Sequence, residues 1–399
     1  MSNEMPLAEN IAKLWLASKR AEIHSLQVLF ELSQLIAHLR KMMHYLQLER
    51  GSSVLFLVEE QTLPDDINYR VYRKAFCEEH AAFNLLLQKW IEECEGKILA
   101  GGVFISLAKA LESLDQPLFQ VRREIDARAI SSLQAAKAIS AVIKDLLSVI
   151  VEMTELTQEP KIAKLMVALI QILNAKELAG QERAYGTYII ASGLIRDKEL
   201  AEQRQGLIDM QHYYFSSFED FAPPETAAAY QAVKQEQGLT VLRNAFENEA
   251  LLGVEQAQQW FAACTLRIEA IQKIEECLIQ LLQLYSAKAL HQADQLLNQD
   301  QRWIADNIQE RAIVIGAASS ATSMLMDKLN QQGKDLKQTQ QALTASKQTL
   351  LEQRVIQQAK AKIMKQLGLS EEAAHRKMQQ AAMQQGMRLI DLAKQLIEK

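Results

Sequence analysis

The chain of 399 residues is 49% hydrophobic and 23% charged, values that exclude a disordered protein, and its length predicts more than one folded unit. Glycine and proline are scarce, at 14 and 6 residues, and every proline lies at or before Pro224. Because the long remainder of the chain contains no strong helix breaker, the composition predicts an all-α fold.

Residues that could carry catalysis or hold a cofactor form no known pattern. The four cysteines lack paired metal-ligand spacing and are too few for a disulfide framework, and the seven histidines form no HExxH motif. The sequence also lacks a Gly-rich phosphate loop and the context of a nucleophile elbow. We therefore expect that the protein is not an enzyme and that it binds no metal and no cofactor.

No segment predicts export or a membrane span. The N-terminal residues alternate polar and apolar side chains at helical spacing, unlike a signal peptide. The most apolar stretch, Ala312–Met326, is shorter than the ~20 residues that a spanning helix needs, and charged residues flank it. We expect a cytoplasmic protein without membrane contact.

Long helices follow one another through most of the chain. Apolar residues recur every three or four positions, and the first such window predicts an amphipathic helix from about Ile23 to Glu60. Breaks are expected at Pro64, Gly101–Gly102, Pro117, Pro160, Pro223–Pro224, Gly253 and Asn298. Antiparallel packing buries such stripes, so we expect an N-terminal unit of two antiparallel four-helix bundles.

Two segments of this unit resemble each other. LQLERGSSVLFL, from Leu46, and LAGQERAYGTYII, from Leu178, share Glu-Arg, then small residues, then an apolar run. The two segments start about 130 residues apart, which fits a duplicated helical bundle, with chance similarity as the alternative.

The arginines of these segments, Arg50 and Arg183, are candidate ligands for an anion. Each lies in an amphipathic helix beside small residues, where a buried guanidinium is costly unless an anionic group accompanies it. Pairing with the preceding Glu49 or Glu182, or a side chain that reaches solvent, is the alternative. The coplanar N–H groups of a guanidinium match small planar oxyanions, and Arg243 offers a third such group.

A polar segment with regularly spaced leucines follows. Leu329, Leu336, Leu343 and Leu350 are seven residues apart. Leucine at one position of each heptad is typical of a weak coiled coil or of a helix docked along another surface, and an exposed connector is the alternative. We expect a long helical linker over residues 296–352.

The C-terminal segment is basic, whereas the rest of the chain is acidic. Residues 354–399 carry nine Lys or Arg against four Asp or Glu, a net charge of +5, and the remainder carries −10. No aromatic residue follows Trp303, so recognition by base stacking is excluded and structured RNA hairpins are favoured as a partner. A helix-turn-helix for DNA and a solvated face without a ligand remain alternatives.

Three short helices are expected in this segment, over residues 354–367, 371–384 and 387–398, with breaks at Gly368 and Gly386. Their surface carries the candidate RNA contacts, which are six basic residues and two small or flexible ones. These candidate residues are Lys360, Ala361, Lys362, Lys365, Arg376, Met383, Arg388 and Lys394.

The segment from Val355 to Ile397 resembles the ANTAR domain, a three-helix RNA-binding module of transcription antiterminators. The matching features include Ala359-Lys360, the run GLSEEAA from Gly368, and the closing LAKQLI. Ala361 departs from the family, which usually has glycine there. The resemblance implies binding to leader mRNA with paired hairpins, which prevents an intrinsic terminator from forming.

The segments around Arg50 and Arg183, with WFAACTLRIEAIQKIEECL from Trp260, resemble the NIT domain, an all-helical module that senses nitrate and nitrite. The resemblance implies nitrate or nitrite as the ligand of these two arginines. It assigns the third position to Arg243, with Arg267 as its competitor.

Together the two resemblances imply a sensor over residues 20–295, the linker, and an ANTAR domain over residues 353–399, in a homodimer. Anion capture would favour one arrangement of the bundles, and the linker would pass this change to the RNA-binding tail. The alternative is a helical signalling adaptor or scaffold whose basic tail binds an acidic protein partner.

Overall fold

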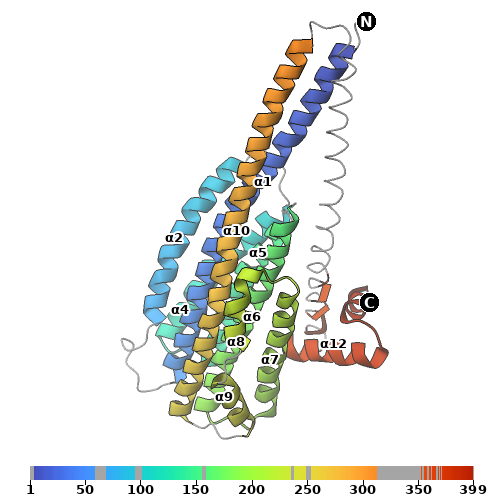
Figure 1. Cartoon of the computed structure of the whole chain (residues 1–399). Helices are drawn as coiled ribbons and strands as arrows, with labels where there is room; N and C mark the ends of the chain where they lie inside the picture. The colour runs from blue at the N-terminus through green and yellow to red at the C-terminus, as the bar shows by residue number, and fades with distance from the viewer. Residues whose placement is uncertain are drawn as a thin grey trace.

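The computed structural model describes residues 4–58, 69–94, 101–154, 159–234, 238–248, 253–311 and most of 352–398. All regular structure in these ranges is helical, and Figure 1 shows the helices as an elongated bundle with the C-terminal helices at one side. The predicted all-α fold is confirmed. Among the described helices, none combines the length and the apolar character that crossing a membrane requires.

The first half of the N-terminal unit is built around two helices, α1 and α5. α1 packs against α2 and α5, and α3 and α4 pack against α5. Two predicted breaks are confirmed, since α3 begins at Gly101 and Pro117 lies in the first turn of α4, where its missing N–H group is tolerated. The helices of this half are α1 (Glu4–Val58), α2 (Tyr69–Cys94), α3 (Gly101–Leu114), α4 (Gln116–Asp126) and α5 (Ser132–Met153).

The second half is built around α6 and α10. α6 packs against both α7 and α10, and α8 packs against α10. Pro160 begins α6, as predicted. The elements of this half are α6 (Pro160–Ala191), α7 (Lys198–Glu219), the 3₁₀ helix η3 (Pro224–Thr226), α8 (Ala227–Lys234), α9 (Gly238–Glu247) and α10 (Val254–Arg311).

The predicted start of the first helix near Ile23 is wrong, because α1 begins at Glu4. The sequence patterns also missed the breaks that follow α4 and α6. Arg128, with φ of 49°, turns the chain after α4, and Ser131 then caps α5 in a reciprocal capping box with Gln134. Gly193, with φ of 67°, ends α6, and the Asp197 side chain caps α7. These boundaries depend on single turn residues, which helical periodicity does not reveal.

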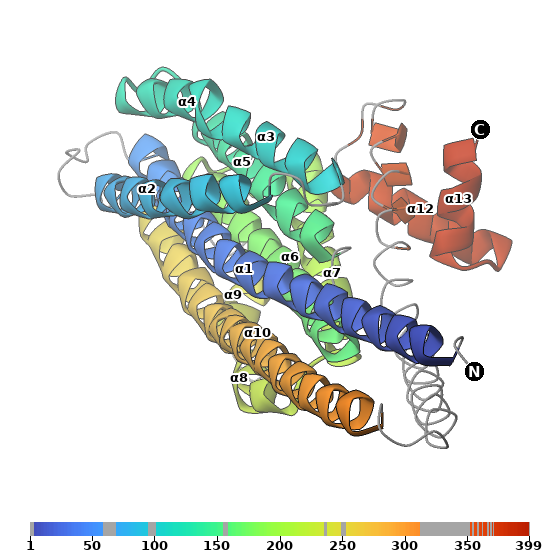
Figure 2. The same ribbon diagram turned by 90° about the horizontal axis from the view of Figure 1, so that it is seen from above.

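The two expected bundles share one core. α1 packs against α6 and α10 as well as against its own half, and one cluster of buried apolar residues includes members from both halves. α6 is buried on nearly every face beyond its first turn, so four of its charged residues, Lys176, Glu177, Glu182 and Arg183, lie in the interior. The central helices α1, α6 and α10 therefore determine where any buried charged site can lie (Figure 2).

α1 and α10 extend together beyond the other helices of the N-terminal unit (Figure 1). Trp15 Nε1 donates to Asp300 Oδ2 at 2.8 Å, and Ala12, Trp15 and Ile304 form a small apolar cluster between the two helices. The predicted break at Asn298 is wrong, because α10 continues through this exposed residue to Arg311. An exposed asparagine costs a helix only a few tenths of a kcal/mol, roughly, and contacts with α1 offset this.

The C-terminal segment ends in α12 (Glu371–Gln385) and α13 (Leu389–Glu398), close to the predicted bounds, with Gly386 at φ of 62° between them. A separate apolar cluster that includes Ile356, Ile363 and Met378 forms its core. The leucine heptads over residues 329–350 and part of the first predicted helix lie outside the described residues.

Candidate anion site and nucleic-acid interface

The side chain of Arg50 extends from α1 to α6, and the side chain of Arg183 extends from α6 to α1. Their side chains are buried, at 0% and 1% exposed. A Cβ atom on Gly180 would clash with the Arg50 guanidinium, and a Cβ atom on Gly51 would clash with that of Arg183. Each segment thus provides a glycine against which the arginine of the other segment lies.

Arg50 is held through one nitrogen and leaves its other donors without protein partners. Nη1 donates to Ser140 Oγ at 2.5 Å and to the Glu177 carboxylate. Glu177 also accepts from Gln47 Nε2 at 3.0 Å and from Gln181 Nε2 at 2.9 Å. Nε and Nη2 of Arg50, which form one edge of the guanidinium, are buried and have no hydrogen-bond partner among the residues that the structure describes. Such an edge can bind two oxygens of an oxyanion side by side.

Arg183 has no carboxylate at ion-pair distance among the described residues. Nη1 donates to Thr265 Oγ1 at 2.9 Å, Nη2 donates to the Gln47 carbonyl at 2.8 Å, and Nε is buried without a partner. The Phe261 ring centroid lies 4.6 Å from the guanidinium carbon. Burial, and then the positive charge of Arg50, lower the pKa of Arg183 to about 10. The arginine pair therefore includes a positive charge that the protein does not balance.

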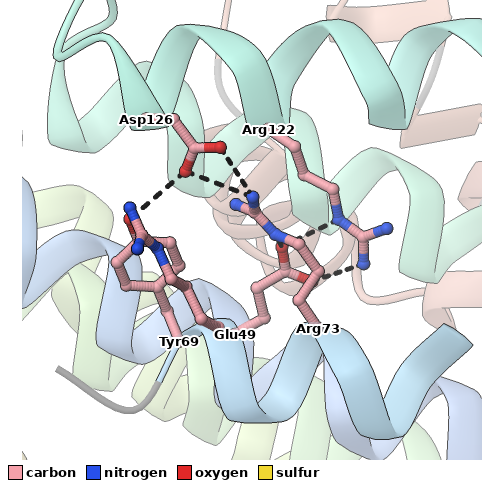
Figure 3. Close-up of polar contacts among 6 residues, drawn as sticks. Glu49, Tyr69, Arg73, Arg122 and Asp126 are labelled. Atoms are coloured by element: carbon pink, nitrogen blue, oxygen red, sulfur yellow. Dashed lines mark hydrogen bonds and ion pairs between the residues drawn. The ribbon is translucent and has the colours of Figure 1, made fainter. Parts of the chain in front are cut away.

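Glu49 pairs with arginines of two other helices. Its carboxylate accepts from Arg73 Nε at 2.9 Å and from Arg122 Nε and Nη2 at 2.8 and 2.6 Å (Figure 3). Asp126 accepts from Arg73 Nη1 at 2.9 Å and so completes this network. The alternative in which Glu49 neutralises Arg50 is wrong, because α2 and α4 supply the partners of this carboxylate.

Glu182 is occupied in a similar way. Arg243 Nε and Nη2 donate to its two oxygens at 2.8 and 2.6 Å, and Gln211 Nε2 donates at 2.7 Å. The alternative in which Glu182 neutralises Arg183 is therefore wrong as well. Arg243 uses its paired N–H groups on this carboxylate. Its role as a third anion ligand stays a prediction.

Arg267, the competitor of Arg243, lies against the second half of the sensor. Nη1 donates to the Val233 carbonyl at 3.4 Å, and the Phe215 ring centroid lies 5.3 Å from its guanidinium carbon. These contacts direct it towards α7 and α8. Its part in the anion site also stays a prediction.

A second buried polar cluster joins α1, α6 and α10. Lys176 Nζ donates to Glu275 Oε2 at 2.6 Å, and Arg40 Nη1 lies 3.8 Å from the same oxygen. Burial, and then Lys176, lower the pKa of His44 to about 2, so its imidazole is neutral. The sequence analysis missed this cluster and Glu177. The sequence of α6 could have indicated them, because charged residues within a stretch of helix that is apolar on every face are expected to be buried.

The arginine pair is enclosed in the bundle. A surface cavity of about 450 Å³ lies between α1, α2 and α10, and its lining includes Glu31, Trp90 and Asp294 but neither Arg50 nor Arg183. The candidate anion site is therefore distinct from this surface cavity.

Three candidate RNA contacts are exposed on the C-terminal helices. Met383 is 82% exposed, the Arg388 side chain is 74% exposed, and Lys394 is exposed on α13. Ala361 and Lys365 lie outside the described residues. Lys394 is therefore accessible to a phosphate backbone, whereas Arg388 donates through Nε and Nη2 to the Asp391 carboxylate at 3.0 and 3.2 Å, an exposed pair that a phosphate would have to replace.

Two further candidates are engaged within the C-terminal domain. Lys362 Nζ donates to the Ile397 carbonyl at 3.1 Å, near the end of α13. Lys360 is only 1% exposed, which corrects the expectation that it lies on the basic surface. It is buried because the helical turn that carries it, with Ala359 and Ile363, packs into the C-terminal core. In this conformation Lys360 does not reach a ligand in solvent.

α12 lies against α7 of the sensor (Figures 1 and 2). Arg376 Nη2 donates to the Glu202 carbonyl at 3.3 Å and to Asp209 Oδ2 at 3.5 Å, and the His375 and Tyr213 rings lie 5.9 Å apart. A candidate RNA contact, Arg376, is therefore occupied by the sensor in this conformation.

Two family models match the chain, one over the N-terminal helical unit and one over the C-terminal helices. The model of the NIT domain, described as nitrate and nitrite sensing, matches residues 41–283. The chain belongs to the NIT family. The NIT domain contains both buried arginines, and a model of the ANTAR domain matches residues 344–397, which include α12 and α13. These families are sensor and RNA-binding modules and not enzymes.

Relatives of this NIT protein match it over nearly the whole length. The nitrate regulatory protein of Klebsiella oxytoca is 30% identical over 398 residues, which cover 96% of this chain and 94% of that protein. The solved structure of the NasR transcription antiterminator is 26% identical, with a TM-score of 0.59 and 98% of both chains covered.

Proposed function

We propose that this protein regulates transcription antitermination in response to nitrate and nitrite. The observation that carries the proposal is the buried pair of Arg50 and Arg183. Among the described residues, the pair has one carboxylate partner, Glu177, which bonds to Arg50, and each guanidinium has N–H groups without an acceptor. A planar monovalent oxyanion supplies both the missing charge and the missing acceptors. Nitrate and nitrite have these properties.

The RNA-binding part of the proposal rests on the C-terminal domain. Met383, Arg388 and Lys394 are exposed, and the segment has no aromatic residue, which favours contacts to the backbone and shape of paired RNA. The proposed partner is a leader mRNA with two hairpins, and its binding prevents the intrinsic terminator from forming. Ala361, Lys362 and Lys365 remain proposed contacts of the first helical segment.

Coupling between the two domains is proposed to act through α12. The contact of Arg376 with α7 holds a candidate RNA-binding residue on the sensor. Moving such an equilibrium from 1:99 to 99:1 requires roughly 5.5 kcal/mol of preference for the RNA-binding state. Burial and the neighbouring Arg50 lower the pKa of Arg183, so an anion that balances this charge is expected to stabilise the conformation that encloses the arginine pair.

A calorimetric titration tests the sensor. Nitrate added to the full-length protein is expected to give saturable heat that is lost in Arg50→Ala and in Arg183→Ala. Arg123→Ala is the matched control, because this arginine is exposed on α4. Unchanged nitrate binding in both buried-site variants would overturn the assignment.

A gel-shift with a two-hairpin leader RNA tests the output. RNA affinity is expected to rise with nitrate and to fall with salt, and Arg388→Ala is expected to flatten the salt slope by about one. Equal affinity for any duplex DNA, or for an acidic protein in place of RNA, would favour the alternative functions. Light scattering on the same samples tests the proposed homodimer.

The proposed boundaries are 20–295 for the sensor, 296–352 for the linker and 353–399 for the RNA-binding domain. The apolar core shared by the two halves lies inside the first range, and the separate cluster around Ile356 lies inside the last. The outer ends of α1 and α10 extend beyond residues 20 and 295, so the helices themselves cross the first boundary. Limited proteolysis followed by mass spectrometry tests them, and a cleavage site inside residues 20–295 in the native protein would contradict the first boundary. A cytoplasmic location is proposed because the RNA partner is made there.

A further inference from the structure

The charges around the arginine pair do not cancel. Arg50 and Arg183 contribute two positive charges, and in the part of the chain that the structure describes Glu177, 7% exposed, contributes the one negative charge bonded to either of them. The neighbouring buried charges have their own partners, since Glu182 binds Arg243 and Lys176 binds the Glu275 carboxylate. The pair and its glutamate therefore carry one net positive charge in the interior.

Glu177 is positioned so that it can stay in place when a ligand binds. It accepts from Nη1 of Arg50, whereas the unpartnered edge of this guanidinium consists of Nε and Nη2. Gln47 and Gln181 donate to the same carboxylate and hold it against Arg50. A ligand that accepts from Nε and Nη2 consequently does not need to displace Glu177.

We propose that Glu177 determines the valence of the ligand, so that the site accepts anions of charge −1 and rejects anions of charge −2. This inference rests on the proposed function and deepens it. A monovalent anion makes the enclosed group of charges neutral. A divalent anion leaves one negative charge unbalanced among apolar helices, where an unpaired charge is strongly unfavourable. Glu177 thus acts as a specificity-determining residue that excludes sulfate-like anions.

Glu177→Gln is the decisive variant. Glutamine keeps the shape and an acceptor oxygen for Arg50, but the site then carries two net positive charges. Removal of the repelling carboxylate is expected to raise nitrate affinity roughly tenfold. The ratio of perchlorate to sulfate affinity isolates valence, because both anions are tetrahedral and similar in size, and this ratio is expected to fall roughly tenfold or more.

Matched variants separate local charge from other effects. Glu177→Asp keeps the negative charge, so it is expected to keep the discrimination against sulfate. Glu49→Gln removes another buried carboxylate, which serves Arg73 and Arg122, and is expected to leave the nitrate to sulfate ratio within about twofold of wild type. Circular dichroism confirms that each variant is folded.

The outcomes distinguish this inference from the proposed function. If wild type gives no nitrate heat, the sensor assignment fails and the valence proposal fails with it. If wild type binds nitrate and Glu177→Gln shows unchanged or weaker nitrate affinity, only the part given to Glu177 is overturned. If Glu177→Gln binds nitrate more tightly but the perchlorate to sulfate ratio is unchanged, the valence proposal is overturned and the proposed function stands.

Discussion

Replacement of Arg183 by methionine should stabilise the anion-free protein. Burial and the neighbouring Arg50 lower the pKa of Arg183 from its ordinary value to about 10, which corresponds to about 3 kcal/mol of destabilisation of the charged form. Because the folded pKa lies below the unfolded value, this cost is fully present below about pH 10 and is relieved as the pH rises above it. Methionine fills similar space without the charge.

The replacement also removes two hydrogen bonds, to Thr265 and to the Gln47 carbonyl. Each contributes about 1 kcal/mol, and Thr265 keeps its bond to the Phe261 carbonyl at 2.7 Å. The expected net gain in unfolding free energy is therefore about 1 kcal/mol. Stabilisation on removal of a buried residue is typical of sites kept for function.

Arg243→Met is the matched control and should have the opposite sign. It leaves the Glu182 carboxylate, 1% exposed, with Gln211 as its only remaining bonded partner among the described residues, which costs about 3 kcal/mol. The two variants should thus differ by about 4 kcal/mol, or about 6 °C in Tm for a sensor of this size.

Differential scanning calorimetry with and without nitrate is the assay. Wild type should gain about 2.7 kcal/mol at nitrate concentrations one hundred times Kd, and Arg183→Met should gain nothing. If Arg183→Met is destabilised as strongly as Arg243→Met, the guanidinium is a satisfied structural group and the reasoning is refuted.

Three further predictions follow from individual contacts. Gly180→Ala should displace the Arg50 guanidinium and weaken nitrate binding by about tenfold, measured by calorimetry, and unchanged affinity would show that the close approach is unimportant. Asp209→Asn removes the carboxylate that pairs with Arg376, so it should release this candidate RNA contact and raise RNA affinity without nitrate by about fivefold in a gel-shift, whereas unchanged affinity would show that this ion pair does not hold α12 on the sensor. Lys394→Ala should weaken RNA binding and reduce the salt slope by about one with no change in Tm, and a lowered Tm would indicate a structural part for this lysine.

The two halves of the sensor use the Glu-Arg pair in the same way. In each half the glutamate turns to an arginine of another helix, and the arginine crosses to the opposite segment and its glycine. This exchange explains why two similar segments create one site in place of two. The proposed anion site therefore lies at the interface between the two halves, where the two similar segments meet.

The sequence by itself determined the helical class, most of the helix boundaries at proline and glycine, and the two segments that contain Arg50 and Arg183. These features are local, because a missing N–H group, a positive φ or an apolar period acts within a few residues. The basic tail and its two last helices were predictable for the same reason.

Only the tertiary structure decided which charges meet. Glu49 and Glu182 each immediately precede an arginine in the sequence, yet helix packing gives Glu49 the partners Arg73 and Arg122 and gives Glu182 the partner Arg243. Helical periodicity determines which side chains share a face, but the partner across an interface depends on how the helices pack. For this reason the sequence identified two arginines, and the fold alone placed Glu177 beside one of them and left the other without a counter-ion.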